Sequence, residues 1–176
     1  MEIACRPTGG GWLLHLPGDI ALTFCVAGPL GAGAFRLTAR HIAHAIAAGC
    51  STNDRDAVVF TGLSIPASRE EVCFERADRD EVVLGDVKVA GVALARLGRS
   101  ALVQTAVPLM SPGDANIRSF ARRFDAMREA ASAALAGRDS ESIVAATIDA
   151  LSRRLNVPLV EWSWQPVSDE RSSGQP

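Results

Sequence analysis

Three consecutive glycines near the start of the chain are the feature that most directly suggests binding chemistry. Gly9, Gly10 and Gly11 follow Arg6 and precede His15. Successive glycines let several backbone N–H groups approach one point, which is the arrangement that a phosphate group needs. An arginine and a histidine beside such a loop add charge-assisted donors. The segment predicts an anion site, and the alternative is a wide glycine loop beside an incidental arginine.

A single lysine is the second feature. Lys88 is the one lysine among 18 lysine and arginine residues. An ammonium is a compact, strongly hydrated point charge, whereas a guanidinium is a planar fork, and the two exchange poorly at specific sites. Lys88 is therefore either incidental or a residue that arginine cannot replace, and the sequence alone leaves both interpretations open.

Three further patterns carry weaker signals. Gly28-x-x-Gly31-x-Gly33 has the reverse spacing of a dinucleotide-binding loop. His41 and His44 lie three residues apart on an expected helix, but no acidic residue stands beside them to complete a metal site. The charged run over 75–81 alternates in sign and predicts a solvated loop. We therefore expect no metal site in the protein.

Composition excludes several classes of protein. The 176 residues are 48% hydrophobic and 22% charged, as expected for one globular domain. A net charge of -2 gives no general attraction to nucleic acid or to anionic lipid. The chain has no apolar run long enough to span a membrane, no signal-peptide pattern and no C-x-x-C pair. We expect a cytoplasmic protein with reduced thiols and no membrane or nucleic-acid partner.

The elements that must position these residues are strands and helices in separate stretches. Apolar periodicity predicts helices over 35–48, where Gly49 acts as a stop, 114–136 and 141–155. Short apolar or alternating runs predict strands over 3–5, 12–15, 20–26, 57–60, 71–74, 81–84, 87–97, 101–109 and 160–164. This order favours an α+β fold. We expect one domain over 1–166 and a polar, disordered tail over 167–176.

Two motifs resemble those of lipoate–protein ligases. Arg6-Pro-Thr-Gly-Gly-Gly-x-x-x-His15-x-x-Gly-Asp19 is similar to the family's R-R-x-x-G-G-G-x-V-x-H-x-x-G-[DN] signature. Val72-Cys73-Phe74, a charged loop and Gly85-Asp86-Val87-Lys88-Val89-Ala90-Gly91-Val92-Ala93 resemble C-F … N-D-[IL] … G-K-K-[IV]-x-G-S-A-Q. The two motifs are in register, and the resemblance covers about residues 3–110.

The resemblance implies a fold, a reaction and a site. The fold would be class II synthetase-like, as in the biotin/lipoate ligase superfamily, with helices packed on a mainly antiparallel sheet. The reaction would join lipoate or octanoate to a lysine of a small lipoyl-carrier domain through an acyl-adenylate, with ATP as substrate and Mg²⁺ as its counter-ion. Lys88 would be catalytic, contacting the acyl carbonyl and the α-phosphate. The acyl-adenylate would be bound by Arg6, Gly9, Gly10, Gly11, His15, Asp86 and Gly91.

Several positions depart from the family pattern. Cys5 replaces the first arginine of the pair, Trp12 stands where a small residue is usual, and Leu94 replaces the glutamine of G-S-A-Q. Gln104-Thr105-Ala106 stands where Q-H-G is common. The glycine motif begins at residue 6, whereas the family has a longer preceding segment. We therefore expect an N-terminally short ligase domain, and a shortened reading frame, a partner chain or real divergence would each account for it.

Two alternatives to the ligase stay open. An octanoyl transferase would take its acyl group from a carrier thioester through a cysteine thiolate close to the lysine. A non-catalytic or partner-dependent relative would keep only the fold. For a ligase, we expect the glycine segment, His15 and Lys88 to line one pocket, and we expect Lys88 to add little to stability.

Overall fold

The structure is a computed structural model, and it describes Thr8, residues 13–27, 31–62, Phe74, 77–111 and 122–156. Within these residues the chain forms an α+β fold with a single antiparallel sheet, which confirms the predicted fold class. The elements in chain order are β1 (Ile20–Val26), α1 (Ala32–Cys50), β2 (Ala57–Val59), β3 (Val82–Leu84), β4 (Val87–Leu97), β5 (Ser100–Val107), α2 (Arg122–Ala134) and α3 (Ser140–Leu155).

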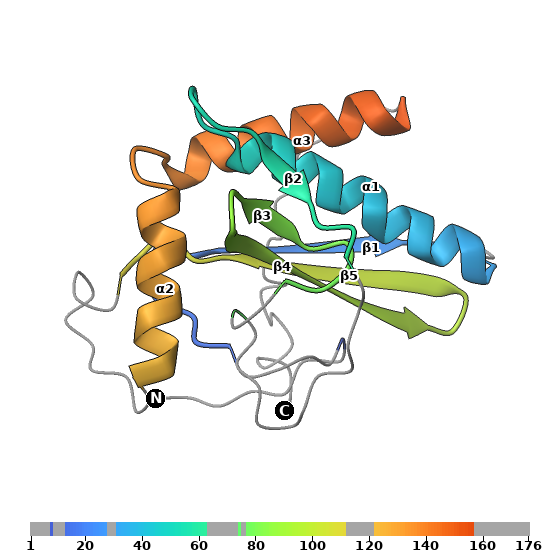
Figure 1. Cartoon of the computed structure of the whole chain (residues 1–176). Coiled ribbons are helices and arrows are strands. Elements are labelled where there is room, and N and C mark those ends of the chain that lie inside the picture. The colour runs from blue at the N-terminus through green and yellow to red at the C-terminus, as the bar shows by residue number, and fades with distance from the viewer. Residues whose placement is uncertain are drawn as a thin grey trace, which may run out of the picture.

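The five strands have the order β1-β5-β4-β3-β2. Helix α1 lies on one face of this sheet, which we call the helix face, and α3 packs against α1 on the same side (Figure 1). Helix α2 contacts β4 and stands at one end of the sheet (Figure 1). The opposite face of the sheet carries Lys88, as described below, and we call it the lysine face.

The main hydrophobic core lies between α1, α3 and the helix face. Ile46 of α1 and Ile143 of α3 are fully buried beside Val82 of β3 and Val103 of β5. Complete burial of an aliphatic side chain contributes about 1.5–3 kcal/mol, so this layer supplies much of the drive to fold. The core also fixes which face each strand residue occupies, because neighbours along a strand alternate between faces.

Gly49 does not end the first helix. Helix α1 continues to Cys50, and Gly49 packs directly against α3. A Cβ atom at this position would lie 2.3 Å from Thr147 Oγ1 and 2.7 Å from the Ile143 carbonyl oxygen. The prediction of a stop at Gly49 was therefore wrong, since the glycine serves close helix packing instead of chain termination.

Most other predicted elements agree with the structure. The strands expected over 20–26, 57–60, 81–84, 87–97 and 101–109 are all present, with ends shifted by two residues or fewer. Residues 13–15, expected as part of a strand, form none and are held by polar contacts instead. The elements expected over 3–5, 71–73, 114–121 and 160–164, and the tail over 167–176, lie outside the described residues. None of the described helices is long and apolar enough to cross a membrane.

Candidate functional site

A β-bulge in β4 determines where Lys88 points. Val82 of β3 pairs with Ala90, whereas the next residue, Val83, pairs with Lys88, so Val89 is an extra residue in β4. Regular alternation from Ala90, which belongs to the core, would place Lys88 under α1. The extra residue instead puts Lys88 beside Val83 on the opposite face. A bulge that redirects a side chain in this way is common next to active sites.

Lys88 is buried and paired on the lysine face. Its side chain is 4% exposed, and its Nζ lies 2.6 Å from Glu81 Oε2. The ammonium also lies 5.1 Å from the centre of the Phe74 ring, within range of a cation–π contact. The expectation that Lys88 adds little to stability is corrected here. Loss of the ammonium would leave the Glu81 carboxylate buried without its cation, which is costly.

Glu81 directly precedes β3, and its side chain is held by the backbone of Asp78. Glu81 Oε2 accepts a hydrogen bond from the Asp78 backbone N–H at 2.6 Å, and the Glu81 N–H donates to the Asp78 carbonyl at 3.1 Å. Burial raises the pKa of the Glu81 carboxyl above its ordinary value, while the Lys88 ammonium acts in the opposite direction. The solvated loop predicted for 75–81 therefore ends in a buried acid that faces the only lysine.

Small residues cover the lysine face beside Lys88. Gly91 of β4 pairs with Ala106 of β5, and Ala93 pairs with Gln104 in the next position on the same face. Gly91 and Ala106 are buried, yet neither brings a bulky side chain to this face. We call these small residues, Gly91, Ala93 and Ala106, the small-residue floor, and such a surface lets a ligand approach the backbone closely.

Thr8, which directly precedes the three glycines in the sequence, contacts the lysine face through Gln104. Its Oγ1 lies 2.9 Å from Gln104 Oε1, so the hydroxyl donates to the side-chain amide oxygen. Gln104 lies on the lysine face, because its neighbour Val103 belongs to the core on the helix face. Thr8 and Lys88, which are 80 positions apart in the printed sequence, are thereby attached to the same face of the sheet.

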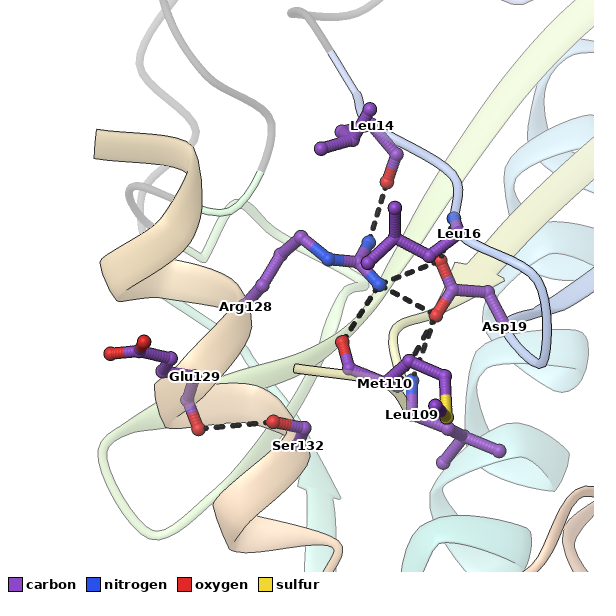
Figure 2. A network of polar contacts seen from close by, with 8 residues as sticks. All are labelled: Leu14, Leu16, Asp19, Leu109, Met110, Arg128, Glu129 and Ser132. Carbon is purple, nitrogen blue, oxygen red and sulfur yellow. Dashed lines mark hydrogen bonds and ion pairs between the residues drawn. The ribbon is translucent and has the colours of Figure 1, made fainter. Parts of the chain in front are cut away.

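A buried ion pair holds the segment that follows the glycines (Figure 2). Arg128 of α2 donates from Nη2 to both Asp19 carboxylate oxygens, at 2.7 and 2.8 Å, and from Nη1 to the Leu14 carbonyl at 2.5 Å. Asp19 also accepts backbone N–H bonds from Leu16 at 2.7 Å and from Leu109 at 3.1 Å. Helix α2, the exit of β5 and the segment before β1 are therefore joined at one point.

This network explains the final part of the glycine motif. Gly18 has a φ of +95°, a conformation that glycine adopts without strain, and it turns the chain so that Asp19 faces inward. His15 lies between Leu14 and Leu16, whose backbone groups are both held by the network. The His15 side chain itself is exposed. Asp19 and Arg128 support this segment, and the role expected of His15 in binding stays a prediction.

The remaining predicted site residues divide into two groups. Arg6, Gly9, Gly10 and Gly11 lie outside the described residues, so their proposed contacts stay predictions. Asp86 is exposed in the turn between β3 and β4, next to Gly85, which has a φ of +62°. The structure thus brings Gly91 close to Lys88 on one strand and leaves Asp86 at the tip of the adjoining hairpin.

Two of the four cysteines are described, and neither is placed to work with Lys88. Burial raises the pKa of the Cys50 thiol to about 12, which removes its thiolate at neutral pH. Cys25 is exposed on β1 and pairs through Leu102 with Ala95, seven residues beyond Lys88 on β4. At ~3.3 Å per strand residue, Cys25 is on the order of 20 Å from Lys88.

Three contributors to the site were missed by the sequence interpretation: Glu81, Arg128 and Gln104. Glu81 was hidden in an alternating charge run, and its position next to a buried strand was the available signal. Arg128 gave no signal, because its partner Asp19 is 109 residues away. Among the described residues there is no group of three or more His, Cys, Asp or Glu side chains that could hold a metal ion.

Comparison with known proteins finds similarity to solved structures but no match to a family model or to a curated protein. Solved lipoate–protein ligases do match the structure. Lipoate-protein ligase A with bound ATP is 15% identical, with a TM-score of 0.55, over 85% of this chain and 57% of that chain.

Two further structures come from Thermoplasma acidophilum. A protein assigned as a lipoate protein ligase, with bound lipoic acid, is 17% identical with a TM-score of 0.62, over 92% of this chain and 61% of that chain. A bipartite lipoate protein ligase, described together with its E2 lipoyl domain, is 14% identical with a TM-score of 0.51, over 86% and 57%. The chain has the lipoate–protein ligase fold and spans about three fifths of the length of these structures.

Proposed function

We propose that the protein is an ATP-dependent lipoate or octanoate ligase domain that works on the lysine face of its sheet. The observation that carries this proposal is the placement of Lys88. The only lysine in the chain is turned by a bulge away from the core, onto the face that also carries the small-residue floor and the attachment of Thr8. A position so specifically constructed favours a functional interpretation of the lone lysine over an incidental one.

The proposed reaction has two steps. An oxygen of the fatty-acid carboxylate attacks the α-phosphorus of ATP, the bond to the β-phosphate bridging oxygen breaks, and pyrophosphate leaves. The amine of a carrier-domain lysine then attacks the acyl carbonyl, AMP leaves with the bonding electrons, and an amide forms with loss of a proton. Negative charge develops first on the α-phosphate oxygens and then on the carbonyl oxygen, and one ammonium held between them can stabilise both.

The surroundings of Lys88 suit this role. The ammonium is largely removed from water, so its field acts on a ligand more strongly than it would in solution. Gly91, Ala93 and Ala106 bring only small side chains to the same face of the sheet, which suits close approach of an acyl-adenylate to the backbone. The glycine segment, with Arg6 and Gly9 to Gly11, would supply backbone and guanidinium donors to the phosphate. Mg²⁺ would enter as the counter-ion of ATP, since the described residues offer no acidic cluster of their own.

We also propose that residues 1–166 form one catalytic domain that works with a further polypeptide segment. A lipoyl-carrier domain would be the protein substrate, and a partner chain would supply the parts of the ligase that this chain does not cover. The lipoate protein ligase from Thermoplasma acidophilum that is described as bi-partite, together with its E2 lipoyl domain, supports this proposal.

The transferase alternative has less support. A thioester mechanism needs a thiolate near the lysine, and within the described part of the chain Cys25 is far from Lys88 while Cys50 is buried. In the other alternative, a relative that keeps only the fold, substitution of Lys88 would have no selective effect on a reaction rate.

Pyrophosphate release from ATP, Mg²⁺ and octanoate or lipoate tests the proposal. With the full chain and its partner segment, Lys88→Ala and Lys88→Arg should each lower the rate by about 10²–10³, or about 3–4 kcal/mol in the barrier. Arg96→Ala on the same strand is the matched control, because Arg96 is exposed and stacks on Phe35 on the helix face. Full activity of Lys88→Arg, or no release by the wild type, would overturn the proposal.

A further inference from the structure

We propose that Glu81 is a positioning residue that holds the Lys88 ammonium over the lysine face. This inference rests on the proposed function of Lys88, but Glu81 itself matches none of the specified letters in the motifs that suggested that function. It lies in the charged loop of the second motif, directly before β3, and from there its carboxylate reaches Lys88.

The geometry separates this pair from an ordinary surface ion pair. The side chains of Lys88 and Glu81 are 4% and 10% exposed, and their charged atoms lie 2.6 Å apart. The Asp78 N–H donates to the same oxygen, Glu81 Oε2, that faces the ammonium. The carboxylate is therefore fixed by the backbone, and it fixes the flexible lysine in turn.

Backbone contacts also immobilise the Glu81 main chain. The Phe60 N–H donates to the Glu81 carbonyl at 2.8 Å, and the Asp80 N–H donates to the Phe60 carbonyl at 3.0 Å. Rigid support of this kind matters because a lysine has four rotatable bonds and loses its position easily. A displacement of about 1 Å of a catalytic group can cost on the order of 10²-fold in rate.

Within the described part of the chain, the charged residues that act on Glu81 are Lys88 and Asp78. Asp80, the adjoining acid, is engaged instead with Arg40 of α1, whose Nε lies 2.9 Å from its Oδ1. The Phe74 ring covers the ammonium from another direction and carries no charge. Protonation of Glu81 would therefore be felt directly at Lys88.

The single lysine makes this inference directly testable by NMR. Labelling with [¹⁵N]lysine gives one side-chain Nζ signal, which needs no assignment. As the pH is lowered, the wild-type signal should show a transition above pH ~4.5, because burial raises the pKa of Glu81. Glu81→Gln should abolish the transition, and Asp78→Asn should retain it. Persistence of the transition in Glu81→Gln would overturn the inference.

A measurement on the wild type guards against a variant that fails to fold. A buried, hydrogen-bonded ammonium exchanges its protons slowly, so the Lys88 Nζ–H signal should be visible at neutral pH. Exchange as fast as that of a free lysine side chain would refute the pairing.

Kinetics distinguish a positioning role from a merely structural one. Glu81→Gln should lower kcat for pyrophosphate release by about 10-fold to 100-fold, with KM for octanoate nearly unchanged. A rise in KM with unchanged kcat would contradict a positioning role. A wild type without activity would refute the proposed ligase function, while the NMR transition would still decide whether Glu81 holds Lys88.

Discussion

Arg128→Met should destabilise the protein by about 3 kcal/mol, because it removes the cation from a buried pair. Arg128 is 3% exposed and donates to Asp19, Leu14 and Met110. Breaking such a pair by removing one partner costs about 3–5 kcal/mol. We expect the lower end of this range, since the Asp19 carboxylate keeps hydrogen bonds from backbone N–H groups that the substitution does not remove.

Urea unfolding followed by far-ultraviolet circular dichroism measures this effect. Arg153→Met is the matched control, because Arg153 forms an exposed ion pair with Asp149 in which both side chains are at least 60% accessible. That control should change the free energy of unfolding very little. The double variant Arg128→Met/Asp19→Asn should lose less than the sum of the two single losses. A loss of less than about 1 kcal/mol in the free energy of unfolding of Arg128→Met would refute the stabilising role of the buried ion pair that Figure 2 shows.

Three further predictions follow from other parts of the structure. Gly91→Val should lower the affinity for an acyl-adenylate mimic by more than about 10-fold in calorimetric titration, because its side chain would rise from the lysine-face floor; unchanged affinity would contradict this. Cys50 should resist iodoacetamide at pH 8 until the protein unfolds, as peptide mass spectrometry would show, because burial raises the pKa of its thiol to about 12. Burial and the nearby Arg154 lower the pKa of His44. Because the unfolded chain then binds a proton more readily than the folded protein, the free energy of unfolding should fall as the pH drops below about 6.5. In thermal unfolding, His44→Gln should flatten this pH dependence.

The sequence predicted the elements that have strong local patterns. The helix around Ile42 and Ile46 follows from apolar spacing, and the strands β1 and β5 follow from apolar runs. Gly49 shows where this reasoning failed. A glycine near the end of an apolar helical run has the same appearance whether it stops the helix or receives another helix, and only the position of α3 decides between them.

The sequence singled out Lys88 but did not predict how its surroundings are built. The lone lysine and the motif over 85–93 both drew attention to Lys88, yet simple alternation in β4 would have placed it under α1. The bulge at Val89 arises from pairing with β3, which a single strand's sequence does not disclose. The contacts of Glu81 with Lys88 and of Arg128 with Asp19 likewise depend on tertiary structure, so no local sequence pattern predicted them.

Direct observation of Lys88 during ligand binding tests the central claim most sharply. The single [¹⁵N]lysine signal would be followed while an octanoyl sulfamoyl-adenosine, a non-hydrolysable mimic of the acyl-adenylate, is added to the full chain with its partner segment. We predict a saturable shift of the Lys88 Nζ signal, because the ammonium would contact the mimic on the lysine face. Binding of the mimic that leaves this signal unchanged, or absence of binding altogether, would contradict the assignment of Lys88 and of the face that carries it.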